Sequence, residues 1–220
     1  MNIFHNNENE KREKERLAVI NFSRAFFAGI IIFEILNFLK ILEFNTQFTW
    51  LGLVITSIMM LGLLEVTAYK YKKKKGHYLH WSIWIIVALS IGLDAAGDFF
   101  HLYGKIYWWD QAVHFFVSAV ITFTLFVVIS SFWIDKFKYS LLFKTGRFEL
   151  SLFLAATSTV SLGAFYEIEE YLEDVIFHTN RLGPGADTAN DLFLNVSGAA
   201  TTVILLIIYY LITHKRKVFD

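Results

Sequence analysis

Residues 79–134 read LHWSIWIIVALSIGLDAAGDFFHLYGKIYWWDQAVHFFVSAVITFTLFVVISSFWI. Two apolar runs flank a short polar turn here, and each is long enough for the roughly 20 residues that a membrane-spanning helix needs. Acidic and histidine residues stand at the facing ends of the runs: Asp94, Asp98 and His101 in the first, Asp110 and His114 in the second. The stretch therefore predicts two antiparallel transmembrane helices with a polar site at one end.

Long apolar runs continue on both sides of this stretch, in a chain of 220 residues that is 55% hydrophobic and 18% aromatic. The expected spans are Leu17–Leu42, Phe48–Tyr69, Leu79–Tyr103, Asp110–Ile134, Leu150–Leu172 and Thr188–Thr213. Such an apolar content is typical of polytopic membrane proteins. We therefore expect an all-α fold, a bundle of six transmembrane helices that form a single transmembrane domain over residues 1–220.

Lysine and arginine residues occur in alternate connections between these helices. They cluster in the charged N-terminal segment 1–16, at residues 70–75, at residues 136–147 and in the tail 214–220. The intervening connections contain only Lys105 and Arg181. Because basic loops stay in the cytoplasm, we expect the N-terminal segment, the tail and therefore both termini to be cytoplasmic.

Four of the expected helices carry a polar stripe at the end that this topology places outside. The stripes are Asp94, Asp98 and His101; Asp110 and His114; Glu167, Glu170 and Asp174; and Asp187, Asp191 and Asn195. Residues three or four apart are neighbours on a helix surface. A charge at the bilayer centre costs about 2.5–3.5 kcal/mol on insertion scales, so we expect these side chains to face one another in a common site.

The expected site contains many acids, and the only bases near it are Lys105 and Arg181. Acids crowded in a low dielectric cannot all stay ionised unless cations or protons bind. The chain has no cysteine, but imidazole and carboxylate groups together bind Zn, Mn or Fe, and an all-oxygen subset suits Mg or Ca. We expect a divalent metal ion, with its identity left open. Its candidate ligands are Asp94, Asp98, His101, Asp110, His114, Glu167, Glu170, Asp187, Asp191 and Asn195.

Ordinary structural roles remain open for several of these polar residues. Asp187 is well placed to cap the last helix, and Asp174 can be solvated at a helix end. Glu65, near the inner end of the second helix, is expected to pair with cytoplasmic lysines. Glu169 points away from the Glu167 stripe and Glu173 is intermediate, so both receive less weight.

The segment at residues 181–198, RLGPGADTANDLFLNVSG, resembles the end of VanZ-like bacterial membrane proteins. The shared features are an acid late in one helix, an arginine, and then Asp-x-x-x-Asn-x-x-Gly. Here they fall on Glu167 or Glu170, Arg181, Asp191, Asn195 and Gly198. VanZ-like proteins usually have Gln where this chain has Glu170.

A closer resemblance is to the YjdF type of bacterial inner-membrane protein, over roughly residues 80–205. Proteins of that type add Asp-x-x-x-Asp, Asp-x-x-x-His and Glu-x-x-Glu. These motifs correspond to Asp94 with Asp98, Asp110 with His114, and Glu167 with Glu170. The resemblance implies a multi-pass protein of the bacterial plasma membrane and supplies no reaction.

Three functions fit this pattern. In a metal-dependent enzyme that acts on a lipid headgroup, the ion would polarise a phosphoryl or carbonyl oxygen and activate water. His114 or Glu167 would be the general base or a ligand, and Arg181 and Lys105 would hold a phosphate at the rim. The alternatives are a cation- or proton-coupled transporter and a structural or accessory protein with a calcium-type site. We expect the lipid bilayer and an anionic lipid or phosphate-bearing ligand as partners, and no nucleic acid.

Overall fold

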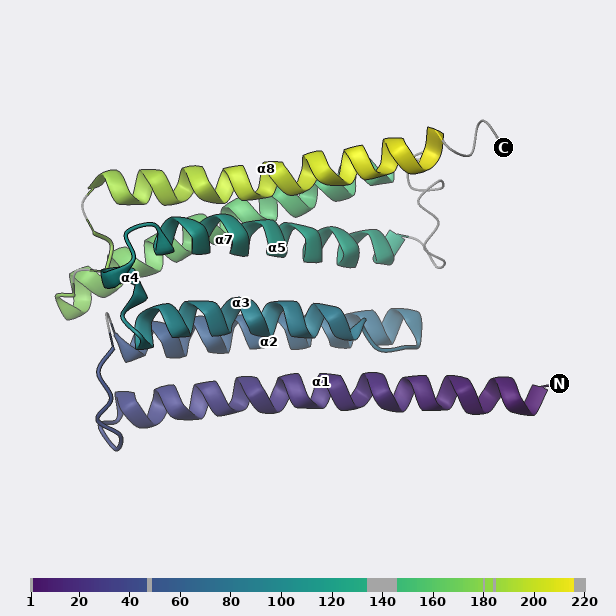
Figure 1. Cartoon of the computed structure of the whole chain (residues 1–220), viewed down its shortest axis with the longest axis horizontal. Helices are drawn as coiled ribbons and strands as arrows, with labels where there is room; N and C mark the ends of the chain where they lie inside the picture. Colours follow the sequence, from purple (N-terminus) through teal and green to yellow (C-terminus); the bar gives the residue numbers. More distant parts are fainter. Residues whose placement is uncertain (1, 47–48, 134–145, 180, 184, 216–220) are drawn as a thin grey trace. The chain divides into compact units, whose positions relative to one another are not determined.

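All regular secondary structure is helical in the part of the chain that the computed structural model describes, which is residues 2–46, 49–133, 146–179, 181–183 and 185–215. The helices are α1 (Asn2–Phe38), α2 (Trp50–Lys75), α3 (Trp81–Phe99), α4 (Leu102–Lys105), α5 (Trp109–Trp133), α7 (Arg147–Phe177) and α8 (Gly185–Lys215) (Figure 1). Six of the helices in these ranges are long and apolar enough to cross a membrane. The prediction of an all-α fold with six spanning helices is confirmed.

Most helices are longer than the apolar runs that predicted them. The first was expected to begin at Leu17, but α1 already runs through the charged segment 1–16 from Asn2. Likewise α2 continues through its lysines to Lys75 and ends at Gly76, whose left-handed φ of 77° suits glycine. Lysine, arginine and glutamate are good helix formers. A search for apolar runs therefore finds the lipid-compatible part of each helix and does not find its charged ends.

The third helix is shorter than predicted. It ends at Phe99, and His101 adopts a left-handed conformation with φ 56° before the short helix α4 begins. His101 therefore lies beyond the helix on which the sequence placed it. The predicted helix start at Phe48, the helix end at Ile134 and most of the basic segment 136–147 lie outside the described residues.

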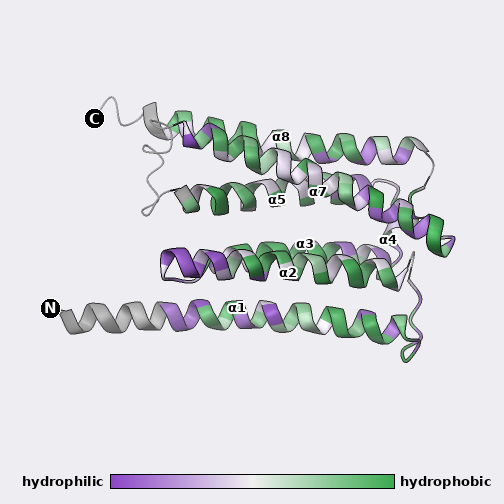
Figure 2. Ribbon diagram, turned by 180° about the vertical axis from the view of Figure 1, so that it is seen from behind, coloured by the Kyte–Doolittle hydropathy of each residue, from purple (hydrophilic) through white to green (hydrophobic). Residues whose placement is uncertain are grey.

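Contacts divide the chain into two compact units, Met1–Ala95 and Ala96–Asp220. The prediction of a single transmembrane domain is not tested by this division, and the cytoplasmic location of the termini also stays a prediction. Figure 2 shows hydrophobic residues along much of the spanning helices and hydrophilic residues at the lysine-rich end of α2.

In the first unit, α1 packs along α2. Arg24 on α1 donates to both carboxylate oxygens of Glu65 on α2, at 2.5 and 2.7 Å, and its guanidinium lies 4.8 Å from the centre of the Trp84 ring. Glu34 is only 1% exposed and accepts a hydrogen bond from the Ser57 hydroxyl at 3.1 Å. The expectation that Glu65 pairs with lysines is wrong, because its partner comes from the neighbouring helix.

In the second unit, α5 packs along both α7 and α8, and α7 also packs on α8. The approach is closest at Gly198, where a β-carbon would overlap the carbonyl oxygen of Phe115 on α5. A small residue is therefore required at this crossing. An apolar core fills the other end of the three helices, and its buried members are Phe126, Phe148, Leu152, Ala155 and Leu206. This arrangement brings the first turns of α5 and α8 beside the C-terminal part of α7.

Candidate metal centre

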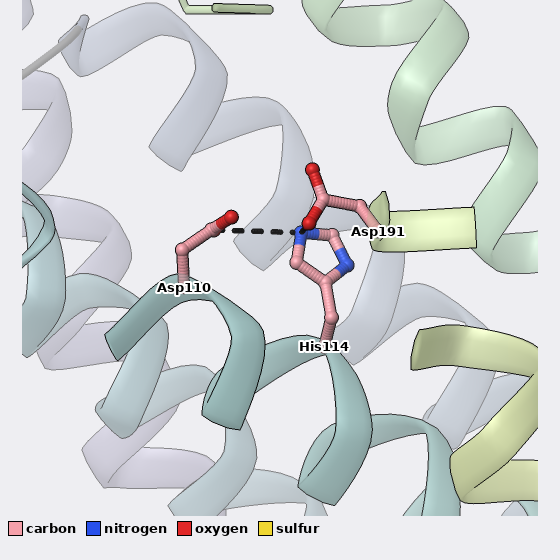
Figure 3. Close-up of side chains that lie close together, drawn as sticks. All are labelled: Asp110, His114 and Asp191. Carbon is pink, nitrogen blue, oxygen red and sulfur yellow. Dashed lines mark ion pairs between the residues drawn. The ribbon is translucent and has the colours of Figure 1, made fainter. Parts of the chain in front are cut away.

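Three helices of the second unit direct acids at one histidine. Asp110 and His114 lie one turn apart at the start of α5, Glu167 comes from α7, and Asp191 comes from the start of α8. The His114 Nε2 atom lies 3.5 Å from an oxygen of Asp110 and 3.9 Å from an oxygen each of Glu167 and Asp191. Figure 3 shows Asp110 and Asp191 pointing at the same ring nitrogen of His114.

This cluster is buried and short of hydrogen-bond donors. His114 is 8% exposed, and Glu167 and Asp191 are each 4% exposed. Both oxygens of Glu167 and Oδ1 of Asp191 are buried with no hydrogen bond of normal geometry in the described part of the chain, although the Thr188 hydroxyl approaches Glu167 and the Asp110 carboxyl group approaches that of Asp191. Buried carboxylates are normally hydrogen-bonded or paired with a cation, so these oxygens are available to a ligand.

The opposite nitrogen of the His114 ring has a separate partner. Its Nδ1 atom lies 3.3 Å from the side-chain oxygen of Asn195, and the same oxygen accepts a hydrogen bond from the Ser118 hydroxyl at 2.7 Å. Gly163 leaves room for this amide, because a β-carbon there would lie 2.5 Å from Asn195 Nδ2. Asn195, a predicted metal ligand, therefore lies on the far side of the ring from the acids.

A second group of acids in the same unit is paired with Arg181. The guanidinium is buried and donates from Nε to Glu170 at 3.0 Å, from Nη1 to Glu173 at 3.3 Å and from Nη2 to the Tyr166 hydroxyl at 2.7 Å. Tyr166 in turn lies edge-on to the His114 ring, with centroids 6.0 Å apart. Glu170, a predicted metal ligand, is thus held by an arginine.

The loop before α8 is fixed by Asp174. Its carboxylate accepts hydrogen bonds from the Thr179 hydroxyl and from the backbone N–H groups of Arg181 and Leu182. Asp174 lies within α7, which continues to Phe177, and it is not merely solvated as the sequence suggested. These contacts carry Arg181 back onto the face of α7 that holds Glu170.

The sequence underrated Tyr166 and Glu173, although a signal for them was present. Tyr166, Glu170 and Glu173 are spaced i, i+4 and i+7, and this spacing puts them on one face of a helix. Their role depends on an arginine that arrives from the following loop, and helical spacing within α7 does not reveal that partner.

The remaining predicted site residues have varied surroundings. Asp187 is half-buried and close enough to Asp110 and His114 for their charges to interact. Asp98 is buried near the end of α3, and Lys105 is exposed, with its Nζ atom bonded to the Phe100 carbonyl at 3.0 Å. Asp94 belongs to the first unit. The metal-ligand roles of Asp94, Asp98, His101 and Asp187 stay predictions, as does phosphate binding by Lys105.

The family model described as "Predicted membrane protein (DUF2238)" matches residues 19–211. The chain belongs to this family. It is also similar to a Thermotoga maritima protein with the name "Uncharacterized protein", at 28% identity over 196 residues that cover 86% of this chain and 88% of that protein. No solved structure matches the chain. The DUF2238 match agrees broadly with the resemblance to YjdF-type proteins, whereas the VanZ-like motif stays an expectation.

In this DUF2238 protein the separations around His114 Nε2 are longer than those of direct hydrogen-bonded ion pairs. Around a tetrahedral ion with bonds of about 2.1 Å, ligand atoms lie about 3.4 Å apart. One ligand atom each from Asp110, His114 and Asp191 fit within 4.8 Å of one another, and the distances of 3.5–3.9 Å from Nε2 approach the tetrahedral value. A direct charge-assisted N–H···O bond would be about 2.7–2.9 Å long.

Proposed function

We propose that this membrane protein binds a divalent metal ion between α5, α7 and α8. Asp110, His114 and Asp191 are the ligands, and Glu167 is either the fourth ligand or the general base of a reaction at the ion. The observation that supports this proposal is the set of carboxylates from three helices around His114 Nε2, at separations near those of metal ligands.

The charge balance of the cluster also supports a bound cation. Three carboxylates of the cluster face one imidazole, and Arg181 already pairs with Glu170 and Glu173. A divalent ion would offset the repulsion among Asp110, Glu167 and Asp191 in a buried setting. One nitrogen together with several oxygens favours Zn, Mn or Fe, whereas Mg and Ca prefer oxygen alone.

Metal-assisted chemistry on a lipid headgroup is the use that we propose for such an ion. A bound divalent ion would polarise a phosphoryl oxygen and lower the pKa of a bound water, and Glu167 would then act as the general base. An anionic headgroup is then the partner, because the ion reverses the local sign of an acidic pocket. In this interpretation the protein resides in the bacterial plasma membrane.

Transport receives less support from the second unit. Phe126 lies twelve residues beyond His114 on α5, which corresponds to about 18 Å along a helix. There it packs with Phe148 and Leu152 in a buried apolar core between α5 and α7. A transport path needs access from both sides of the membrane, and this core occupies the end of the bundle opposite the acids.

Metal analysis of the purified full chain tests the proposal. The protein is stripped with chelator and then titrated separately with Zn²⁺, Mn²⁺, Fe²⁺ and Ca²⁺. We expect one of the three transition metals to bind stoichiometrically. Asp110→Asn, His114→Gln, Glu167→Gln and Asp191→Asn should each weaken binding by about tenfold or more, since each removes a ligand or a neighbouring charge.

Glu149→Gln is the matched control, because Glu149 is an exposed acid in the first turn of the same helix as Glu167. Its metal content should equal that of the unaltered protein. Equal metal content in all five variants would show that the cluster is not the site. Stoichiometric Ca²⁺ binding without transition-metal binding would favour the structural alternative.

The headgroup reaction is tested separately from binding. Metal-loaded protein is incubated with mixed micelles of detergent and phosphatidylglycerol, and released glycerol phosphate or glycerol is measured. Release should depend on the added ion and be absent in Asp191→Asn. Metal binding without any release would leave the metal site standing and remove this reaction.

An outward-facing site also requires the predicted topology. Reporter fusions after Lys75, Gly146 and Asp220 should report the cytoplasm, and fusions near Lys105 and Gly183 should report the outside. Cytoplasmic signals from the Lys105 and Gly183 fusions would place the Asp110–His114 end of α5 in the cytoplasm. They would exclude a lipid headgroup of the outer face as the substrate.

A further inference from the structure

The His114 ring is held from the side opposite the acids, and this second set of contacts decides which nitrogen is free. Asn195 Oδ1 lies 3.3 Å from Nδ1, while Nε2 faces Asp110, Glu167 and Asp191. A neutral imidazole has one N–H donor and one nitrogen with a lone pair. The partner of one nitrogen therefore determines what the other can do.

The amide oxygen can accept from the histidine because Asn195 is itself fixed. Ser118 lies one turn after His114 on α5 and donates to the same oxygen at 2.7 Å. Asn195 is 2% exposed and Ser118 is 4% exposed, so water does not compete for these contacts. In this orientation, with its oxygen between Ser118 and His114, the amide would accept a hydrogen bond from a protonated Nδ1.

The other end of the amide is closely packed, and its Nδ2 is buried without a hydrogen-bond partner in the described part of the chain. Nδ2 of Asn195 faces Gly163 on α7, at a place where any larger residue would collide with the amide. In either orientation of the amide, one of its polar ends lies against this glycine. The two orientations differ in whether the group that faces Nδ1 is an acceptor or a donor.

The distances on the acid side discriminate between these orientations. If the amide donated to Nδ1, the proton would sit on Nε2 and would be expected to form a hydrogen bond with a carboxylate. Both contacts are longer than the usual 2.7–3.2 Å of an N–H···O bond, but Asn195 Oδ1 is closer to Nδ1, at 3.3 Å, than the nearest carboxylate oxygen is to Nε2, at 3.5 Å. The spacing therefore favours a lone pair on Nε2.

We infer that Asn195 and Ser118 are positioning residues that hold His114 as the Nδ1–H tautomer and present the Nε2 lone pair to a metal ion. This inference deepens the proposed function and rests on it for the metal, but the tautomer itself is a property of the metal-free protein. It also replaces the expectation that Asn195 is a ligand. Hydrogen bonds to the second nitrogen of a ligating histidine commonly change metal affinity by about 10–100-fold.

The tautomer can be read directly by NMR. The full chain is labelled with ¹⁵N-histidine, stripped of metal and studied at alkaline pH, with the His114 signals assigned by their loss in His114→Gln. We expect a proton on Nδ1 and none on Nε2. Asn195→Leu, which keeps the size of the side chain but removes the acceptor, should give a mixture of tautomers, and Asn195→Asp should restore the Nδ1–H form.

Zn²⁺ titration of the same variants gives the second readout. Asn195→Leu should bind Zn²⁺ about 10–100-fold more weakly, and Ser118→Ala should show a smaller loss in the same direction. Ser131→Ala is the control for Ser118→Ala, because Ser131 is a buried serine on α5 whose hydroxyl donates to the Val128 carbonyl. Its tautomer and its Zn²⁺ affinity should both match the unaltered protein.

A proton on Nε2 at alkaline pH, either alone or together with one on Nδ1, would overturn the inference. An unchanged tautomer in Asn195→Leu would overturn it as well. These outcomes are distinct from failure of the proposed function. If the unaltered protein shows the Nδ1–H tautomer but binds no metal, the proposed function fails and the positioning by Asn195 stands.

Discussion

Arg24 in the first unit holds both oxygens of Glu65, whereas in the second unit three acids surround His114 without a residue of fixed positive charge among them. Both arrangements place charges in helices that suit a membrane. In the first, the charges neutralise each other and tie α1 to α2. In the second, like charges are concentrated, and a bound cation is the natural partner.

A buried acid is therefore not by itself a sign of function. Glu170 and Glu173 lie on the same helix as Glu167, yet both form ion pairs with Arg181, as Glu65 does with Arg24. An acid that pairs with an arginine stabilises the contact between segments of the chain, whereas an acid with no such partner is a candidate metal ligand. Substitutions that remove one charge should therefore have opposite effects on stability in the two kinds of cluster.

The largest effect is expected at Arg181. Arg181→Gln leaves Glu170 and Glu173 buried without their cation, and such a loss typically costs about 3–5 kcal/mol. At about 2–4 °C per kcal/mol for a chain of this size, the Tm of the detergent-solubilised protein should fall by about 10 °C. Lys105→Gln, at an exposed lysine, is the control and should leave the Tm unchanged.

The same variant separates bracing from ligand binding. If Arg181 only braces α7 and its loop, binding of a soluble phosphate mimic should fall only as the folded fraction falls. Weakened phosphate binding at an unchanged Tm would instead support a direct contact between Arg181 and the ligand.

Addition of the preferred metal ion should have the next largest effect. A ligand at 100 times its Kd stabilises the folded state by about 2.7 kcal/mol, so the Tm of stripped protein should rise by about 5–10 °C. Asp191→Asn should abolish this rise, and Arg24→Gln should retain it. An equal rise in Asp191→Asn would place the ion elsewhere in the molecule.

Arg24→Gln should lower stability by a smaller amount. Hydrogen bonds to charged groups contribute about 1.5–3 kcal/mol, so we expect the Tm to fall by about 5 °C. The double variant Arg24→Gln with Glu65→Gln should be no less stable than Arg24→Gln alone, because it leaves no unpaired charge. Strictly additive losses would show that the two side chains do not stabilise each other.

The smallest expected effect has the opposite sign. Glu167→Gln relieves repulsion from Asp110 and Asp191, and relief of strain at a binding site commonly stabilises a protein by about 0.5–2 kcal/mol. The Tm of the metal-free protein should therefore rise by about 2–4 °C, whereas the exposed control Glu149→Gln should change little. A lower Tm for Glu167→Gln in the absence of metal would mean that Glu167 braces the fold.

The number of spanning helices and the faces of their polar stripes were predictable from the sequence, because both are local properties. Run length and hydropathy identify a spanning helix, and the 3.6-residue period places Asp110 beside His114. The ends of the helices were less predictable. Charged residues extend α1 and α2 beyond the apolar runs, and the left-handed His101 shortens α3.

The partners of the polar residues were decided only by the tertiary structure. Spacing along α8 grouped Asn195 with Asp191. In the structure, α5 and α8 cross closely at Gly198, and Asn195 contacts the Nδ1 atom of His114 instead of the Nε2 atom that Asp191 faces. Likewise, the acids of α7 divide between His114 and an arginine that returns from the next loop. Backbone hydrogen bonds within four residues set a helix face, whereas which faces meet depends on how side chains pack between helices distant in sequence.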